Sequence, residues 1–274
     1  MLLIMGLGGP SIWWDDELCT TLSEQGFYVI RYDNRDVGRS TYLHGARVTR
    51  GQLASAYLGN HRRPAPYTLS DMADDGLGLL DHLGIEAAHL WGVSMGGMIA
   101  QTMAIARPDR VRSLVSTMST TGRRTVGWSD PRLLPLLIGR RLTSGDGYVR
   151  QSARVWRAIG SRAYPEPPEK TEQRARDTWD RGVSRVGSAR QMMAILTQPD
   201  RTAGLHRLRV PTLVLHGMSD RLVHPSGGRA TAAAVPGAEL VLIRGMGHDL
   251  PQQLNPVFVD AVCRTAARAE KVRR

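Results

Sequence analysis

The stretch GVSMG, which contains Ser94, places a hydroxyl where it could act as a nucleophile. An apolar run at 88–93 leads into this motif, and a helical pattern at 95–106 follows it at once. Between a strand and a helix, G-x-S-x-G predicts a sharp, strained turn that lifts the serine Oγ above the sheet. The following helix N-terminus directs positive partial charge at a developing oxyanion. The motif can arise by chance in a chain with 29 glycines, but this setting favours catalysis.

A nucleophilic serine needs a base and an acid that orients the base, here expected in the order Ser, Asp or Glu, His. Asp220 follows the apolar run PTLVLHG, and His248 follows the next run, AELVLI. Because active sites form at the carboxyl ends of parallel strands, the three side chains are expected to converge from three loops. We predict that His248 takes the proton of Ser94 Oγ and later returns one to the leaving group. Asp220 would fix the imidazole tautomer and stabilise the imidazolium.

Other candidates for the base and the acid are weaker. Three histidines are expected to pack, cap a helix or hydrogen-bond locally, because they lie in a strand, at its end or at a helix start: His89, His216 and His224. Asp249 adjoins His248, and neighbours on a turn rarely point at each other. The segment STMSTTG (116–122), which follows an earlier strand, contains no carboxylate, so Asp220 is favoured as the acid.

The N-terminal stretch MLLIMGLGGP runs from apolar residues into a glycine loop at 6–9. Such a loop can cradle the pyrophosphate of a dinucleotide, or it can present a backbone N–H to a reacting carbonyl oxygen. Asp33 closes the next predicted strand, about where a ribose-binding acid would stand, so a dinucleotide-binding oxidoreductase is a second hypothesis. Against it, Ser11 occupies the third glycine position and Pro10 stiffens the loop. The dinucleotide-binding hypothesis also leaves Ser94, Asp220 and His248 without a role.

Alternating strand and helix patterns surround these candidate residues. Six near-continuous apolar runs indicate strands covered on both faces: 2–5, 27–32, 88–93, 111–117, 211–217 and 238–243. Five helical patterns accompany them: 14–25, 69–83, 95–106, 226–235 and 251–269. Asp71, Asp74 and Asp75 favour a helix N-terminus near Ser70. The alternation predicts an α/β fold with a mostly parallel sheet flanked by helices.

The alternation breaks between residues 121 and 207. The segments there have helical patterns, and none has the pattern of a buried strand. We therefore expect a core made of residues 1–120 and 208–274, with a helical insertion at 121–207. The insertion contains three tryptophans: Trp128, Trp156 and Trp179.

Composition narrows the class of protein. The 274 residues are 42% hydrophobic and 22% charged, which suits one large globular domain with an insertion. The net charge of +11 could indicate a nucleic-acid partner, but the arginines that supply it are scattered without interleaved aromatics, so none is expected. Cys19 and Cys263 have no metal spacing, and neither a metal nor a cofactor is expected. No apolar stretch approaches the roughly 20 residues of a membrane span. We expect the protein to be located in the cytoplasm. We also expect it to be a monomer or a homodimer.

The chain resembles the α/β-hydrolase superfamily over nearly its whole length. The motifs GLGG, RYDNRDVGRS, GVSMGG, GMSD and GMGH occur in that superfamily's order. It is most similar to actinobacterial esterases of the aclacinomycin methylesterase type. Asp36 stands where most relatives have glycine, and MG replaces the usual HG before the glycine loop.

The resemblance implies particular site residues. It implies a Ser-Asp-His triad, matching Ser94, Asp220 and His248. It implies an oxyanion hole made of two backbone N–H groups, one on Met95 and one at the position matching Leu7. It also implies a helical cap, matching the expected insertion.

The resemblance also implies a strand hairpin before the strand that ends at Met5, and this chain has none. The N-terminal edge strands are therefore expected to be missing, and we hypothesise a truncated or mis-assigned start. The strand at 27–32 would then be a long apolar sheet edge, which promotes aggregation unless it is covered.

The leading prediction is a serine hydrolase that cleaves an apolar small-molecule or lipid-like carboxylic ester through an acyl-enzyme. The same triad serves thioesters, lactones, amide bonds at an N-terminal proline, carbon–carbon cleavage and cofactor-free peroxidation, and the fold does not choose among them. A proline iminopeptidase would need acidic residues to hold the substrate amine. Glu166, Glu169 and Glu172 are present, but in a proline-rich segment expected to be exposed.

Overall fold

The computed structural model describes residues 1–60, 64–133 and 144–272. This part of the chain contains six strands: β1 (Leu2–Ile4), β2 (Ile30–Arg31), β3 (Ala88–Val93), β4 (Val111–Thr117), β5 (Thr212–Gly217) and β6 (Glu239–Ile243). They form one parallel sheet in the order β2-β1-β3-β4-β5-β6, which confirms the predicted sheet. The chain turns to one side after β1 and to the other after β3. The loops that follow these two strands therefore diverge, and such a switch point forms a crevice at the carboxyl ends.

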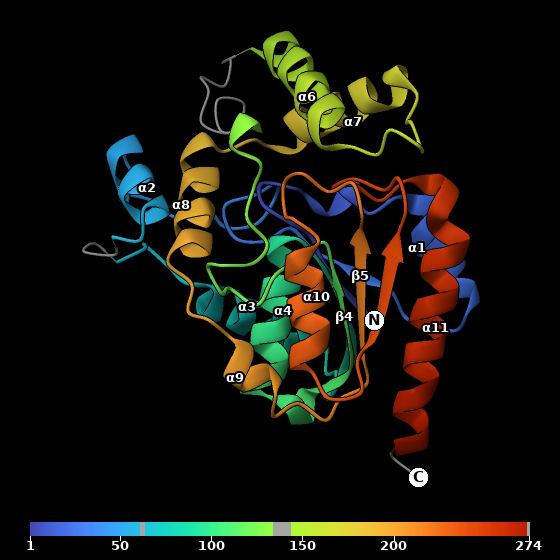
Figure 1. Cartoon of the computed structure of the whole chain (residues 1–274). Coiled ribbons are helices and arrows are strands. Elements are labelled where there is room, and N and C mark those ends of the chain that lie inside the picture. Colours follow the sequence, from blue (N-terminus) through green and yellow to red (C-terminus); the bar gives the residue numbers. More distant parts are fainter. Residues whose placement is uncertain (61–63, 134–143, 273–274) are drawn as a thin grey trace.

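Helices cover both faces of the sheet (Figure 1). The described helices are α1 (Asp16–Glu24), α2 (Arg50–Tyr57), α3 (Leu69–His82), α4 (Met95–Ala106), α6 (Gly145–Ile159), α7 (Pro168–Arg181), α8 (Arg185–Leu196), α9 (Thr202–Leu205), α10 (Ser226–Ala234) and α11 (Asn255–Val272). Short 3₁₀ turns lie at Ser11–Trp13, Pro108–Arg110, Pro131–Leu133 and Gln252–Leu254. No helix within these ranges is both long enough and apolar enough to cross a lipid bilayer.

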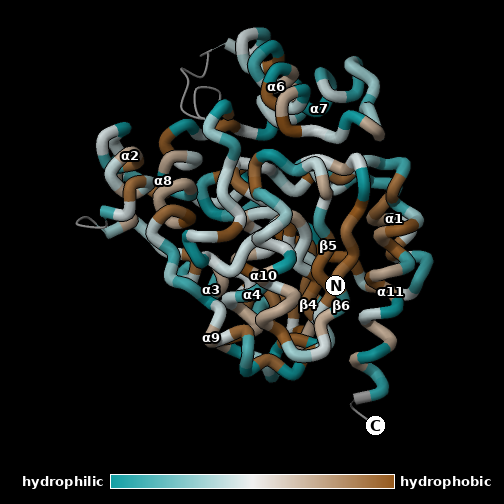
Figure 2. Tube along the Cα trace, in the orientation of Figure 1, coloured by the Kyte–Doolittle hydropathy of each residue, from teal (hydrophilic) through white to brown (hydrophobic). Residues whose placement is uncertain are grey.

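The period-two alternation of β1 shows how the sheet divides the core. Leu2 and Ile4 pack with the buried faces of α3 and α4, whereas Leu3 and Met5 pack on the opposite side with α1 and α11. All four side chains are buried. Figure 2 shows apolar residues gathered along the strands in the middle of the molecule.

The predicted strand at 27–32 is much shorter than expected. Only Ile30–Arg31 pairs with β1, although its place at the edge of the sheet is as predicted. Phe27 and Val29 instead pack against the core cluster that includes Met1 and Trp91, and Tyr28 is 73% exposed. The apolar residues at 27 and 29 thus serve core packing, and only two residues of the predicted strand pair with β1.

Two helices begin with capping boxes that were not predicted, although α3 starts at Leu69 as the pattern at 69–83 indicates. Thr68, rather than a residue within the helix, caps α3 through a capping box in which the Thr68 hydroxyl accepts from Asp71 N–H and the Asp71 carboxylate accepts from Thr68 N–H. Helix α2 was not predicted, because its sequence RGQLASAY lacks apolar periodicity. It is likewise stabilised at its start by a capping box, between Thr49 and Gln52.

Of the helices between β4 and β5, α6 and α7 lie above the carboxyl ends of the strands and α8 lies to their side, whereas α9 lies at the other end of the molecule (Figure 1). Within the described parts of 121–207 there are helices and turns but no strand, as the sequence pattern indicates. Helices α6 and α7 pack against each other, and α8 packs beside α2. Helices α6 and α7 therefore lie over the carboxyl ends of the strands, where the candidate residues were expected.

Candidate active site

Ser94 occupies a strained turn between β3 and α4. Its φ of 57° and ψ of −119° fall outside the usual regions for a residue with a side chain. A Cβ on Gly96 would lie 1.9 Å from the carbonyl oxygen of Ile4, so only glycine lets the helix start this close to β1. Ser94 N–H donates to Thr117 O at 2.8 Å, and the Ser119 hydroxyl donates to Ser94 O at 2.8 Å. These bonds hold the turn against the end of β4.

Asp220 and His248 are brought together by the loops that follow β5 and β6. His248 Nδ1 lies 2.7 Å from Asp220 Oδ2, and both side chains are buried. The other oxygen, Oδ1, accepts the N–H groups of Leu222 and Val223 at 2.8 and 2.9 Å. Because these three groups hold the carboxylate, its orientation is fixed before any substrate binds.

Burial by itself would raise the pKa of the Asp220 carboxyl. The positive charge of His248 and the hydrogen bonds from His216 and His248 outweigh this effect and lower the pKa to about 2. Asp220 is therefore a carboxylate at any pH near neutrality. A fixed carboxylate beside Nδ1 keeps the proton on that nitrogen and leaves Nε2 of His248 to exchange one.

His216, one of the weaker histidine candidates, packs and hydrogen-bonds locally as expected. Its Nε2 donates to the carbonyl of Val223 at 2.8 Å and lies 3.4 Å from Asp220 Oδ2. The ring is fully buried beneath α10, where a Cβ on Gly228 would lie 2.5 Å from its Nδ1. His216 therefore supports the acid but cannot reach a substrate.

The loop that carries His248 is tied to the end of α6. His248 N–H donates to Ile159 O at 2.7 Å, and Gly247 N–H donates to the Ser161 hydroxyl oxygen at 2.8 Å. The Ser161 hydroxyl in turn donates to Asp249 Oδ1 at 2.5 Å. Asp249 thus points away from the base, as predicted, and binds a serine that no sequence signal had marked.

The glycine loop after β1 lies against Ser94. A Cβ on Gly6 would stand 3.1 Å from Ser94 Cβ and 3.7 Å from its Oγ. Leu7 lies at the middle of a turn closed by Gly9 N–H donating to Gly6 O at 3.2 Å. Met95 is the first residue of α4, so its N–H has no partner within the helix. The structure thus brings the loop of Leu7 and the start of α4 to the same turn.

A cavity of about 500 Å³ lies between these loops and helices α6 and α7. Ser94, Leu7 and His248 all line it, and no hydrogen bond joins Ser94 to His248 in the described part of the chain. Such pairs often shorten only when substrate is bound. The cavity therefore gives a reacting group simultaneous access to the candidate nucleophile, base and loop.

Two tryptophans lie in the wall of this cavity. Trp13 and Trp156 line the cavity with their ring centroids 5.2 Å apart. Of the other tryptophans in the helical segment, Trp128 stacks on His224 and is 52% exposed, and Trp179 packs beside Tyr148. One of the three tryptophans of the predicted insertion thus lines the cavity, as does Trp13 of the core.

The contacts of Asp33 argue against the dinucleotide-binding hypothesis. Its carboxylate is buried and accepts the N–H groups of Ser11 and Arg39 at 2.7 and 2.8 Å, and Arg181 Nε lies 2.9 Å away. Asp33 therefore holds the glycine loop to its surroundings and leaves no oxygen for a ribose. Within the described ranges, no group of three or more His, Cys, Asp and Glu side chains is arranged to hold a metal ion.

Sequence and structure comparisons agree with the resemblance that the motifs indicated. A sequence model of the family described as "alpha/beta hydrolase fold" matches residues 1–251. The rhodomycin D methylesterase DauP of Streptomyces sp. strain C5 is 28% identical, over 96% of this chain and 89% of that protein.

Solved structures show the same fold. A hydrolase from Pseudomonas aeruginosa PA01 superposes with a TM-score of 0.70 and 26% identity, over 96% of this chain and 88% of that one. The enol-lactonase from Burkholderia xenovorans LB400 gives a TM-score of 0.74 at 24% identity, over 97% and 90% of the two chains. At that identity the second likeness shows the fold alone.

Proposed function

Since the chain belongs to the α/β-hydrolase fold family, we propose that it hydrolyses carboxylic esters through an acyl-enzyme on Ser94. One observation carries the proposal. Ser94 sits on a strained turn in the same cavity as His248, whose Nδ1 is bound to the buried Asp220. A nucleophile, a base and an orienting acid from three separate loops are the arrangement that acyl transfer requires.

In the first half of the reaction, Ser94 Oγ attacks the ester carbonyl as its proton passes to His248 Nε2. Asp220 stabilises the imidazolium that forms, because its low pKa keeps it ionised beside Nδ1. The resulting oxyanion would lie between the N–H groups of Leu7 and Met95, at the positive end of the α4 dipole. His248 then gives its proton to the alcohol oxygen, which leaves.

In the second half, a water molecule attacks the acyl-enzyme carbonyl as His248 Nε2 takes one of its protons. The tetrahedral intermediate collapses, the carboxylic acid departs, and Ser94 Oγ regains a proton from His248. Both halves use the same pair of N–H donors, and removing one such donor typically costs about 10²–10³ in rate.

The cavity supports an ester with a sizeable apolar or aromatic part. Trp13 and Trp156 present their rings to it, and Met118 and Leu250 add apolar surface. That one relative is a rhodomycin D methylesterase agrees with cleavage of an ester bond. We propose that the helices of 121–207 act as a cap that supplies this wall, and that residues 1–120 and 208–274 form the catalytic core of a cytoplasmic enzyme.

Amide cleavage at an N-terminal proline is less well supported. Glu166, which lines the cavity, accepts two hydrogen bonds from Arg174 at 2.7 Å each and a third from Thr171 at 2.6 Å. Glu169 and Glu172 are exposed. The Glu166 carboxylate is thus already neutralised by Arg174, which leaves it poorly suited to bind a substrate amine.

The central test is Ser94→Ala. We expect this substitution to lower kcat for p-nitrophenyl butyrate by at least about 10⁴-fold and to abolish labelling by a fluorophosphonate, because the acyl-enzyme cannot form. Wild-type protein assayed on an ester, a thioester, a lactone, a vinylogous diketone and a proline anilide would show which bond is preferred. Hydrolysis that persists undiminished in Ser94→Ala would overturn the proposal.

A further inference from the structure

A buried glutamine of α8 reaches the glycine loop. Gln191 Oε1 accepts the N–H of Gly8 at 2.8 Å, and Gln191 Nε2 donates to Arg35 O at 2.8 Å. The side chain is completely buried and uses both ends of its amide. Gly8 is the residue that follows Leu7, so this contact lies one peptide from the proposed oxyanion donor.

Three consecutive peptide groups in the loop are each held by one hydrogen bond. Asn34 Nδ2 donates to Met5 O at 2.9 Å, Gly9 N–H donates to Gly6 O at 3.2 Å, and Gly8 N–H donates to Gln191. In a trans peptide the C=O and N–H point in opposite directions. Fixing Gly6 O therefore fixes the opposite direction for Leu7 N–H.

The loop needs such restraint because of its composition. Gly8 has a φ of +64°, and a glycine on either side of Leu7 allows the intervening peptides to rotate at little cost. The bond that closes the turn is the longest of the three. The two side-chain amides of Asn34 and Gln191 hold the flanking peptides, and rotation of the middle peptide would have to strain both.

Helix α8 is itself fixed firmly enough to serve as a support. Arg190, beside Gln191, binds the carboxylate of Asp36 through Nη2 at 2.5 Å and Nε at 2.7 Å, with both side chains buried. Tyr67 donates to the same carboxylate at 2.8 Å. A Cβ on Gly187 would lie 2.6 Å from Asp36 Cβ, so the helix and the loop after β2 are in close contact.

We infer that Gln191 is a positioning residue that orients the Leu7 N–H toward the oxyanion. The inference rests on the proposed function, since it assigns Gln191 a role in the transition state of that reaction. An N–H donor held in position stabilises the negative charge that develops in the transition state and contributes little to substrate binding. Losing Gln191 should therefore lower kcat and leave KM nearly unchanged.

The test is Gln191→Met, which keeps the length of the side chain and removes both hydrogen bonds. We expect kcat for p-nitrophenyl butyrate to fall about 10-fold with KM within about twofold of wild type. The affinity for a trifluoromethyl ketone, which forms an oxyanion on Ser94, should fall by the same factor. Thr265→Val is the control, because it removes a fully buried hydroxyl that donates to Ala261 O in the distant α11, and its kcat should not change.

A second variant keeps the inference testable if Gln191→Met does not fold. In Gln191→Glu the protonated carboxyl can accept from Gly8 N–H and donate to Arg35 O, whereas the carboxylate cannot donate. The neighbouring charges are already paired, Arg190 with Asp36 and Arg35 with Asp75. The ratio of variant to wild-type kcat should therefore rise as the pH falls.

The outcomes separate the inference from the function on which it rests. An unchanged kcat in Gln191→Met, or a kcat ratio in Gln191→Glu that does not vary with pH, would overturn the role of Gln191. Wild-type protein that neither hydrolyses an ester nor reacts with a fluorophosphonate would instead overturn the proposed function.

Discussion

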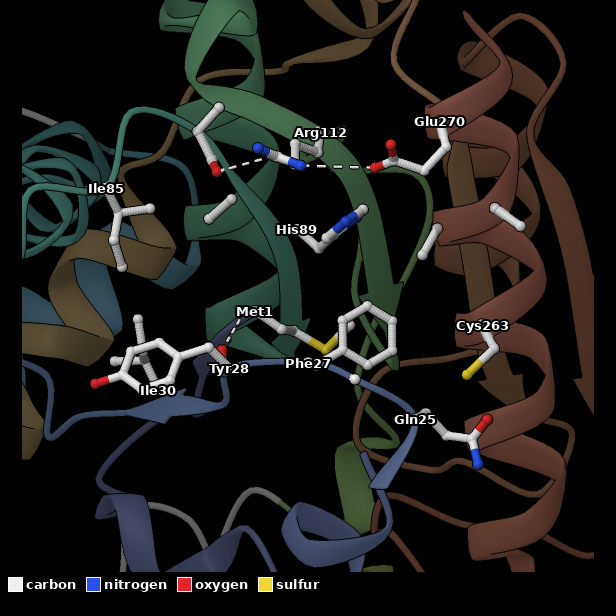
Figure 3. A pocket seen from close by; sticks show the side chains of 15 residues that line it. Met1, Gln25, Phe27, Tyr28, Ile30, Ile85, His89, Arg112, Cys263 and Glu270 are labelled. Atoms are coloured by element: carbon white, nitrogen blue, oxygen red, sulfur yellow. Dashed lines mark hydrogen bonds and ion pairs between the residues drawn. The ribbon is translucent and has the colours of Figure 1, made fainter. Parts of the chain in front are cut away.

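Two cavities of similar size lie at opposite ends of the sheet, and their polar groups are used very differently. The carboxyl-end cavity, lined by Ser94 and His248, has a volume of about 500 Å³. The amino-end cavity, of about 540 Å³, is formed by the starts of β1, β3 and β4 and by the end of α11. Figure 3 shows Met1, Phe27 and His89 at its centre.

The polar groups of the amino-end cavity bind near neighbours. Arg112 donates to Ala87 O at 3.1 Å and lies 3.6 Å from Glu270. Figure 3 draws the contact between Arg112 and Glu270. His89 Nδ1 lies 2.8 Å from Ser113 Oγ on the adjacent strand. These contacts hold neighbouring elements together, but they do not bring a nucleophile and a base to the same point.

The difference follows from the topology of a parallel sheet. At the carboxyl ends the loops after β1, β3, β5 and β6 open toward one crevice, so side chains distant in sequence converge there. At the amino ends the chain arrives from helices that are packed on either face. Cavity volume alone therefore does not distinguish the two cavities, whereas the convergence of loop residues favours the carboxyl-end cavity as the candidate site.

The largest expected effect on kcat tests whether the loop residues that converge at the carboxyl-end cavity act together. We expect Asp220→Asn to lower kcat by about 10⁴-fold, because an amide beside Nδ1 favours the wrong tautomer of His248 and cannot stabilise the imidazolium. Steady-state hydrolysis of p-nitrophenyl butyrate measures the change. Asp109→Asn, which removes an exposed carboxylate paired with Arg107, should leave kcat unchanged. Equal activity in the two variants would remove Asp220 from the reaction.

A smaller effect compares Ser161, which lines the carboxyl-end cavity, with Ser113, which contacts a residue lining the amino-end cavity. Ser161 ties the His248 loop to α6, and Ser113 contacts His89 at the amino-end cavity; both are buried. Each serine-to-alanine change should lower the free energy of unfolding by about 1–2 kcal/mol, because a buried partner loses its hydrogen bond. Only Ser161→Ala should also lower kcat, by about 5-fold, since the His248 loop is then less well held.

Urea denaturation and steady-state kinetics on the two variants separate these contributions. If Ser113→Ala lowered kcat as much as Ser161→Ala, activity would simply follow stability, and the contrast between the cavities would not hold.

The sequence predicted the parts of the molecule that depend on local pattern. The apolar runs located β3 and β4 to the residue, and the G-x-S-x-G motif located the turn at Ser94, because buried parallel strands and a strained turn each demand particular residues in order. The strand at 27–32 was overestimated, since apolar side chains serve core packing as well as pairing. Helix α2 was missed because its stability at the N-terminus comes from a cap and not from periodicity.

The supporting residues could not be read from the sequence. Gln191 meets Gly8 across 183 positions, and Ser161 meets Asp249 across 88, and nothing in the local pattern distinguishes them from ordinary polar residues of a helical segment. Asp36 stood out in the sequence only as a departure from the family motif, and its pairing with Arg190 depends on how α8 packs against the loop after β2. Long-range contacts of this kind follow from the assembled fold.

The smallest expected effect concerns a thiol of the amino-end cavity. Cys263 lines it, and burial raises the pKa of that thiol above its ordinary value. In Cys19→Ser, which leaves Cys263 as the one cysteine of the chain, alkylation by iodoacetamide at pH 7 should be slower than that of glutathione and should speed up as the pH rises, because the thiolate is the reacting form.

The alkylated protein should keep kcat within about twofold of the unmodified variant, since the new group enters the cavity at the end of the sheet far from Ser94. Mass spectrometry gives the extent of modification and the ester assay gives kcat on the same sample. Loss of activity in proportion to alkylation, slowed by substrate, would mean that the two cavities communicate. Retained activity would assign to the amino-end cavity a packing role, because filling it leaves the loops at the other end of the strands in place.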